Sequence, residues 1–477
     1  MKDRRLLNVV ARHGLTLLLL TALAAESLWL MAPVQFLGDE HHYSNVGLAV
    51  ASGLLGYSSF HQVILAVVDK GMFLPGTGFL LMPVYLFNGL EPSVLDVRIY
   101  SLSLNLALLV LIARELTTRF SPLTTNIFLA ICLVSPFYVS YLAGAWSDIF
   151  AMHFALLFLL WLDRNLARSK MVTAATAGLL LAGVVYIRPI YFPFLALTVA
   201  LWVIVALQNQ AGFKEVARPI VRRGLIMTAI FVALLTPWSY TVSDLYGPTI
   251  FLTTPKVAGQ QWCANPQWNP NIPAGVELKK WGQFFRQTQE QARKNGIGFS
   301  EQARILSEEA CADVTPEIRL QRNSRAIERF FLYPERYVQR FMLRGCDGDA
   351  CKPAGTMHTV LDVTRVSWFV LLGLGVVITL VPFGRSRNGS YLLPVFLKAA
   401  VCIVCMHPLI SISHSRYHVV LIPVFAIMVA LLASGHFRIW RCDPGEKALS
   451  WLLAAGQLVP FLMLAAYTTF LVFWPAG

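Results

Sequence analysis

Charged residues are scarce in this chain. Of its 477 residues only 14% are Asp, Glu, Lys or Arg, whereas 56% are hydrophobic. Soluble globular domains carry roughly 25% charged residues, so this composition excludes an ordinary soluble fold. The net charge of +13 does not indicate nucleic acid as a partner, because the basic residues stand in short clusters between apolar runs. The composition predicts a polytopic membrane protein.

Motifs for nucleotide and metal chemistry are missing as well. The sequence contains no P-loop and no sign of a nucleotide-sugar fold. Its cysteines and histidines form no set that supports a zinc site, and no repeat at solenoid periods is visible. The chemistry of the protein therefore has to be sought in isolated polar residues between apolar segments.

The eight cysteines fall into two environments. Four lie in apolar runs or in a short basic loop, where a thiol behaves as a small hydrophobe. These are Cys132, Cys402, Cys405 and Cys442. The other four share the one long polar segment, where an even count suits disulfides in an oxidising compartment. One pairing joins Cys346 to Cys351 and Cys263 to Cys311, but the spacing alone leaves the connectivity open.

Eleven apolar runs approach the ~20 residues that a helix needs to cross a bilayer. They occupy residues 14–36, 98–118, 122–142, 148–163, 171–187, 190–207, 220–242, 360–383, 391–411, 417–434 and 449–474. The first follows a basic N-terminus and lacks a clear cleavage site, which predicts an uncleaved signal anchor. A twelfth run, 71–89, is interrupted by glycine and proline.

The basic loops decide whether 71–89 crosses the membrane, because Lys and Arg collect on the cytoplasmic side. All the basic clusters reach that side together with the N-terminus only if this run does not cross. The clusters lie at 114–119, 164–170, 214–223, 385–387 and 438–441. We therefore expect an all-α polytopic membrane protein of about eleven transmembrane helices, with extracytoplasmic juxtamembrane helices in 42–90.

This topology divides the chain into three parts. Residues 1–243 form an N-terminal transmembrane module that includes a first extracytoplasmic loop, 37–97. Residues 244–358 are extracytoplasmic and fold as a small domain or lie as a lid on the bundle. Residues 359–477 supply the C-terminal transmembrane helices. The unusual polar clusters then all fall on the extracytoplasmic side.

Two adjacent acids, Asp39 and Glu40, stand at the outer end of the first run, followed at once by His41, His42 and Tyr43. A carboxylate at a low-dielectric interface gains basicity, so it can act as a general base or orient a nucleophile. The alternative is a hydrated pair at a helix end. Asp148 opens the fourth run on the same side, where helix capping is an equal explanation.

Three cations share that side with the acids: Lys70, preceded by Asp69, then Arg188 and Arg416. Charges at such depth are costly and are usually paired or functional. Cations can neutralise a leaving phosphate while an acid deprotonates the acceptor, which suits a phosphate-bearing substrate. Snorkelling to the interface is the alternative for Lys70 and Arg188.

Two histidines, His414 and His418, flank Arg416 and Tyr417 at four-residue spacing. On a helix this spacing puts both imidazoles on one face, where they could hold a divalent cation. The alternative is a pair of solvated interfacial histidines. We expect no metal site here, although a divalent cation stays open as a cofactor.

Several short motifs follow one another along the chain. The first is the Asp-Glu followed by Tyr within 36–43, and the second is the acid-Lys entry to a broken helix at 69–75. The later ones are Val97-Arg98-Ile99, Ser-Pro…Asp over 135–148, Gly-Leu…Arg-Pro over 178–189, Pro-Trp…Gly…Asn-Pro over 237–266, and Arg-Tyr…Pro over 416–423.

In order and sidedness these motifs resemble the GT-C membrane glycosyltransferases that use polyprenyl- or dolichyl-phosphate sugars. The resemblance is mainly to the family branch of protein O-mannosyltransferases and lipid A aminoarabinose transferases. It runs along nearly the whole chain. Two departures concern donor binding. Ser243-Asp244 stands where relatives carry Arg-Asn, and Gly71 replaces the proline that follows the lysine.

The resemblance implies a GT-C-like fold and roles for individual residues. Asp39 would be the catalytic base that activates an acceptor hydroxyl, with Glu40 and Asp148 positioning it. The lipid phosphate would be held by Lys70, Arg188 and Arg416. Asp69, Tyr43, Tyr417 and His418 are secondary candidates. One displacement inverts the anomeric centre without a glycosyl-enzyme intermediate.

The partners implied are a polyprenyl-phosphate-linked sugar donor, membrane lipids, and a glycan, lipid or protein acceptor that the sequence does not identify. The short chain without retention signals favours a bacterial inner membrane, with the site on the periplasmic side. Rival hypotheses are a transporter or flippase, a polysaccharide ligase, and an inactive relative that binds polyprenyl phosphate.

Overall fold

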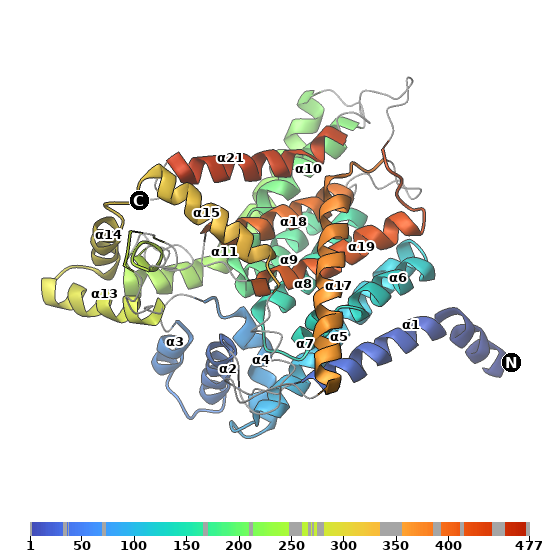
Figure 1. Ribbon diagram of the computed structural model, residues 1–477, viewed down its shortest axis with the longest axis horizontal. Helices are drawn as coiled ribbons and strands as arrows, with labels where there is room; N and C mark the ends of the chain where they lie inside the picture. Colours follow the sequence, from blue (N-terminus) through green and yellow to red (C-terminus); the bar gives the residue numbers. More distant parts are fainter. Residues whose placement is uncertain are drawn as a thin grey trace.

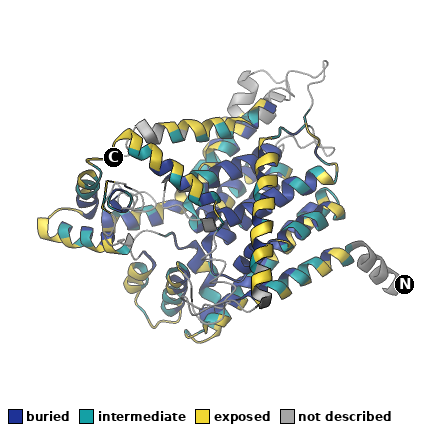
Figure 2. Ribbon diagram, in the orientation of Figure 1, coloured by how far each residue is buried: buried dark blue, intermediate teal, exposed yellow. Residues whose placement is uncertain are grey.

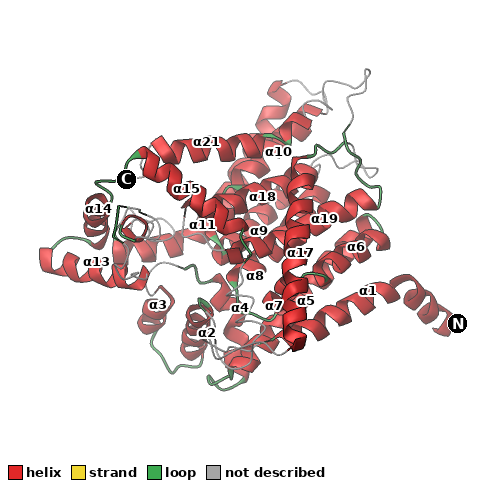
Figure 3. Ribbon diagram, in the orientation of Figure 1, coloured by secondary structure: helices red, strands yellow, loops and turns green. Residues whose placement is uncertain are grey.

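The fold of the chain is all-helical (Figure 3). The computed structural model describes residues 2–31, 36, 38–68, 73–165, 170–208, 213–247, 260–265, 269, 271–273, 281–333, 355–384, 393–410, 415–440 and 454–473. Within these ranges the only β pairing is an isolated bridge between Phe383 and Ile439.

The N-terminal half supplies the helices that surround the polar clusters. They are α1 (Lys2–Leu30), α2 (Glu40–Leu54), α3 (Phe60–Val68), α4 (Gly76–Phe87), α5 (Val94–Arg119), α6 (Pro122–Leu133), α7 (Pro136–Leu142), α8 (Ser147–Asn165), α9 (Met171–Ile187), the 3₁₀ turn η1 (Pro189–Tyr191), α10 (Phe194–Gln208) and α11 (Phe213–Tyr246).

The C-terminal half contains three helices of the long polar segment and the remaining apolar helices. They are α13 (Trp281–Asn295), α14 (Phe299–Ala310), α15 (Pro316–Phe331), α17 (Gly355–Leu380), α18 (Leu393–Ile410), the 3₁₀ helix η2 (Ser415–Leu421), α19 (Ile422–Ala433) and α21 (Val459–Phe473). In Figure 1, α13 and α14 lie at one end of the molecule and the N-terminus at the other.

Several helices have the length and composition to cross a membrane, which supports an all-α membrane protein. Among the described residues four qualify: His13–Leu30, Val94–Arg119, Pro219–Tyr246 and Leu361–Leu380. Six further apolar helices are shorter, between 10 and 17 residues. The count of eleven spans therefore stays a prediction.

The run 122–142, expected as one span, is two helices. α6 and α7 meet at an angle of 94°. Pro136 opens α7, and proline both lacks an N–H and drives the preceding residue, here Ser135, out of the helical conformation. The bend turns α7 inward, and all seven of its residues are buried.

Helix α8 lies at the centre of the core (Figure 2). Fourteen of its 19 residues are buried, among α5, α9, α18 and η2. A helix that is apolar on all sides is surrounded either by protein or by lipid, and here the protein surrounds it. Asp148 begins this helix, so its side chain starts inside the packed bundle rather than at its rim.

Helix α4 has 12 residues and is one of six apolar helices shorter than the ~20 residues that cross a bilayer, so the non-crossing 71–89 segment stays a prediction. It packs on α2 through two glycines. A Cβ on Gly78 would lie 2.2 Å from a Val46 methyl, and one on Gly47 would lie 3.1 Å from the Gly78 carbonyl. The hydroxyls of Ser44 and Tyr85 also join the two helices.

The long polar segment packs on the bundle. Phe284, Phe285 and Phe299 of α13 and α14 share one apolar cluster with Trp238 of α11 and Val67 of α3. The pairing of Cys263 with Cys311 is confirmed as a disulfide. Cys346 and Cys351 lie outside the described residues. Helix α15 also packs on α18 and α21, so this part of the segment contacts the bundle, and the lid and the small domain both stay predictions.

Candidate functional site

The two adjacent acids of the sequence occupy different environments. Asp39 is the residue before α2, and its carbonyl accepts the His42 N–H at 3.0 Å. Glu40 begins the helix and is fully buried. Successive helix residues point about 100° apart, so one acid can turn into the bundle while its neighbour does not.

Glu40 is held by a buried network. Arg98 of α5 donates from Nη2 to Oε2 at 2.8 Å, with both side chains at most 1% exposed. The Ala145 N–H donates to Oε1, also at 2.8 Å. Both oxygens of the carboxylate are therefore engaged, and they connect α2 to α5 and to the turn before α8. This geometry suits a positioning role.

Asp148 and Arg188 form a second ion pair deep in the structure. Arg188 donates from Nε to Oδ1 of Asp148 at 2.6 Å and donates a second bond to the same oxygen from Nη2. The side chains are 7% and 12% exposed, respectively. Burial by itself lowers the pKa of Arg188, but Asp148 raises it above its ordinary value, so the guanidinium stays charged.

Two tyrosines complete the surroundings of this pair. The Arg188 guanidinium lies over the ring of Tyr417 in η2, 5.3 Å from its centroid. The Tyr43 hydroxyl is 2.6 Å from the Ser147 hydroxyl. Burial raises the pKa of Tyr43 far above its ordinary value; Arg188 lowers it, while Asp39 and Asp148 raise it. All three charges are therefore close enough to the Tyr43 hydroxyl to influence it.

We call Asp39, Tyr43, Asp148, Arg188 and Tyr417 the charged site. Its members come from the start of α2, the start of α8, the end of α9 and η2. These elements are far apart in the sequence, and all five residues were predicted as candidates. Their convergence gives one buried cation, two acids and two phenol rings within a packed helical bundle.

The turn between α7 and α8 positions part of the site. Gly144 lies against Trp146, and a Cβ at 144 would lie 2.1 Å from the indole ring. Trp146 in turn stacks on Tyr141 with the centroids 5.4 Å apart. This turn carries the Ala145 N–H that meets Glu40, and it leads directly to Ser147.

A chain of buried polar groups fixes the other end of the turn. Asn105 donates from Nδ2 to the Leu142 carbonyl at 2.9 Å, and its Oδ1 lies 3.0 Å from Nδ1 of His153. The Tyr138 hydroxyl is 2.8 Å from Nε2 of the same ring. With the Asn105 carbonyl as acceptor, His153 is protonated on Nδ1 and accepts from Tyr138.

Of the remaining predicted residues, His418 lies outside the charged site. His418 is buried in an aromatic cluster, 4.8 Å from the ring of Trp368, with Phe330 and Phe331 beside it. Among the described residues no three His, Cys, Asp or Glu side chains could hold a metal ion together. Asp69, Lys70 and His414 fall outside the described residues, as does the side chain of Arg416.

Sequence reasoning missed two contributors, Arg98 and Ser147. Arg98 was noted only as part of a motif, although a single arginine opening the apolar run 98–118 is itself a signal. An arginine within a membrane segment needs a buried partner, and the structure supplies Glu40. Ser147 precedes Asp148 and carried no signal of its own.

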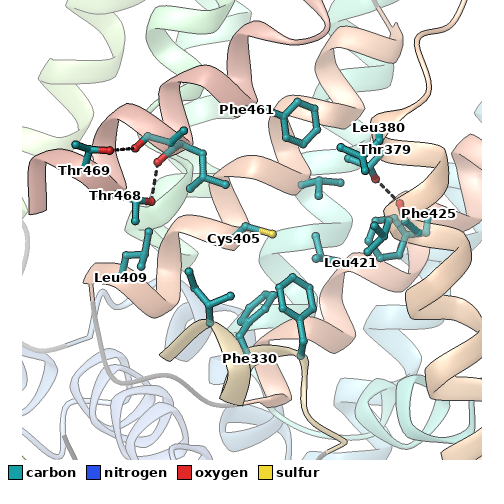
Figure 4. Close-up of a pocket in the computed structure, with 17 residues that line it drawn as sticks. Phe330, Thr379, Leu380, Cys405, Leu409, Leu421, Phe425, Phe461, Thr468 and Thr469 are labelled. Carbon is teal, nitrogen blue, oxygen red and sulfur yellow. Dashed lines mark hydrogen bonds between the residues drawn. The ribbon is translucent and has the colours of Figure 1, made fainter. Parts of the chain in front are cut away.

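An apolar cavity of about 510 Å³ lies among the C-terminal helices (Figure 4). Its lining comes from α15, α17, α18, α19 and α21, with Leu421 contributed by η2. The threonine hydroxyls of the lining bond to their own helices, Thr379 to Gly375 at 2.5 Å and Thr468 to Leu464 at 2.8 Å. The cavity therefore offers an almost wholly hydrocarbon surface.

Helix η2 connects the cavity and the charged site. Tyr417 faces Arg188, and Leu421 lines the cavity four residues later. At ~2.0 Å rise per residue in a 3₁₀ helix, the two positions are ~8 Å apart along the axis. A charged group beside Arg188 and a hydrocarbon chain in the cavity would lie within the reach of one molecule.

The chain matches no protein-family model, and no curated protein is similar to it at a significant level.

Proposed function

We propose that the protein is an integral-membrane inverting glycosyltransferase that moves a sugar from a polyprenyl-phosphate donor to an extracytoplasmic acceptor. The observation that carries the proposal is the buried Asp148–Arg188 pair, close to Tyr43 and Asp39. Tyr417, which lies against Arg188, is ~8 Å along η2 from Leu421 of the hydrocarbon-lined cavity. A donor of this class carries an anionic phosphate and a long apolar tail on one molecule. The site is expected on the periplasmic side of a bacterial inner membrane.

Arg188 supplies the charge that the leaving group needs. As the bond between the anomeric carbon and the phosphate oxygen breaks, the lipid phosphate keeps the electron pair and gains negative charge. A fixed guanidinium stabilises that charge without reorganising, because Asp148 and Tyr417 already hold its position. Lys70 and Arg416 are proposed as further phosphate contacts.

Asp39 accepts the proton of the acceptor hydroxyl in this scheme. The acceptor oxygen forms the new glycosidic bond on the face opposite the leaving phosphate, so the configuration at the anomeric carbon inverts. Glu40 does not take part directly, because both of its oxygens are engaged by Arg98 and Ala145. Its role is to fix the start of α2, and therefore the position of Asp39.

The test is donor turnover by the full-length protein in membranes. A panel of synthetic undecaprenyl-phosphate sugars is supplied with an envelope fraction, and released undecaprenyl phosphate is measured. We expect Asp39→Asn to abolish release while donor binding to the purified variant is retained. The matched control is Asp313→Asn, an exposed acid between α14 and α15, which should release at the wild-type rate.

Two results would overturn the proposal. Release by Asp39→Asn at the wild-type rate would remove the assigned base. Movement of the intact lipid-linked sugar across a liposome bilayer, with no release by the wild type, would identify a flippase instead. An inactive relative would bind the donor and do neither.

A further inference from the structure

The turn that joins α2 to α3 exposes large apolar side chains although both helices are short. We call residues 54–60 the α2–α3 tip. Leu54, Tyr57 and Phe60 are 66%, 76% and 80% exposed. Helix α2 has 15 residues and α3 has nine, both fewer than the ~20 needed to span a bilayer. In Figure 1 the two helices lie at the edge of the molecule, and Figure 2 shows exposed residues along them.

The region around the tip carries no formal charge. Between His41 and Val68 there is no Asp, Glu, Lys or Arg, whereas acids and a lysine stand immediately outside this interval, at 39–40 and 69–70. Exposed surface in water normally carries charge, and a contiguous apolar patch without it marks a contact with lipid or with another protein. The pattern is that of a segment selected against charge.

Several N–H and hydroxyl groups of the tip are bonded within it. The N–H groups of Leu55, Gly56 and Tyr57 donate to the carbonyls of Ala51, Gly53 and Ser52 at 2.9–3.1 Å. The Ser58 hydroxyl pairs with that of Ser52 at 2.7 Å, and Gln62 accepts from both the N–H and the hydroxyl of Ser59. Internal bonds of this kind reduce the cost of placing a turn in lipid, because hydrocarbon offers no hydrogen bonds.

The tip is also a packed unit. A Cβ on Gly53 would lie 2.4 Å from a Val63 methyl, so α2 and α3 approach through this glycine. Gly56 supplies the positive φ of 78° that the turn requires. The exposed side chains are therefore held on a fixed surface rather than on a fraying end.

We propose that the α2–α3 tip inserts into one leaflet of the bilayer and anchors the end of α2 and the start of α3 at the membrane surface. The insertion is driven by apolar burial alone, since the region has no cation to attract anionic lipid. Tyr57 has the amphipathic ring that favours the boundary between headgroups and chains. The inference is independent of the proposed function, because it concerns depth and not turnover.

The experiment measures the depth of a genetically encoded spin label at Phe60, and separately at Tyr57, in the full-length protein in phosphatidylcholine nanodiscs. Oxygen concentrates in hydrocarbon and a water-soluble nickel chelate does not. We expect collisions with oxygen to exceed those with the chelate several-fold at both positions, unchanged by anionic lipid or by salt. The matched control is a label at Glu290 on the exposed side of α13, where the order should reverse.

Three results would overturn the proposal. Access by the chelate at both positions would place the tip in water. Protection from both reagents with spin–spin coupling between molecules would identify a second copy as the partner. Protection from both without coupling would mean that the chain itself covers the tip.

Discussion

Two of the buried acid–arginine pairs among the described residues, Glu40–Arg98 and Asp148–Arg188, differ in their surroundings although each joins one carboxylate to one guanidinium. Glu40 and Arg98 are at most 1% exposed, and both Glu40 oxygens are bound by the protein. In the second pair the Arg188 bonds converge on one oxygen of Asp148, and the guanidinium lies over Tyr417. The Glu40–Arg98 pair links two helices by bonds within the protein. The Asp148–Arg188 pair holds a cation beside other titratable groups.

This difference separates a structural pair from a functional one. Removing one partner of a fully buried pair leaves an uncompensated charge in a low-dielectric environment, which lowers the stability of the protein. Removing one partner of a pair that faces a site mainly changes what the site can stabilise. The two pairs should therefore respond differently to equivalent substitutions, and the following predictions use that contrast.

The largest effect is expected for Arg98→Met. The variant leaves Glu40 buried without its cation, so unfolding should become easier by about 3–5 kcal/mol. The double variant Glu40→Gln/Arg98→Met removes both charges and should recover part of the loss. Thermal unfolding of the detergent-solubilised protein measures the effect.

The control for this prediction is the exposed pair Arg164–Glu115, whose side chains are 56% and 28% exposed. Exposed pairs contribute about 0–1 kcal/mol, so Glu115→Gln should unfold close to the wild type. If Arg98→Met also unfolded at the wild-type temperature, the joint between α2 and α5 would not depend on the Glu40–Arg98 pair.

The second prediction concerns Arg188→Lys, which keeps the charge but loses the planar fork. We expect the release of undecaprenyl phosphate to fall about 10²–10³-fold, the usual cost of misplacing one group that stabilises transition-state charge. The unfolding temperature should fall less than it does for Arg98→Met. Equal losses of stability in the two variants, with activity retained in Arg188→Lys, would erase the distinction between the pairs.

The smallest effect is expected for Tyr43→Phe. The change removes the hydroxyl bonded to Ser147, a neutral hydrogen bond that contributes about 1 kcal/mol. The pKa of Tyr43 is raised by burial, so its folded form stays neutral while an unfolded tyrosine ionises near pH ~10. Stability from this group is complete below pH ~10 and is lost above it.

A pH series of thermal unfolding checks the sign of that effect. The wild type should lose more stability than Tyr43→Phe as the pH rises above ~10, and the two should run parallel below it. A steeper loss in Tyr43→Phe would mean that the phenol is ionised in the folded protein.

Much of the fold and of the charged site followed from the sequence because both depend on strong signals. Long apolar runs are helices, and isolated charges between them are costly enough to be paired. Asp148 and Arg188 were predicted on one side of the bundle, and the structure brings them into contact. The Cys263–Cys311 disulfide was one of the pairings considered, and geometry selects it.

Other features depend on directions that a sequence does not state. Asp39 and Glu40 are neighbours with the same chemistry. Only the folded position of α2, which brings Glu40 to Arg98 of α5, decides which of the two acids is buried. Hydropathy located the run 122–142 but could not show that it bends by 94°, although Pro136 was the available signal. Hydropathy likewise finds apolar helices without deciding which of them cross.

Gly144 limits how this sequence can vary. It carries no functional group, but the space that a side chain would need is already filled by the ring of Trp146. In a library that randomises the turn, we expect only glycine at 144 to survive selection for folded protein, whereas the exposed Asp313 should accept many residues. Gly144 is then the most constrained position near the charged site, because it contributes by having no side chain.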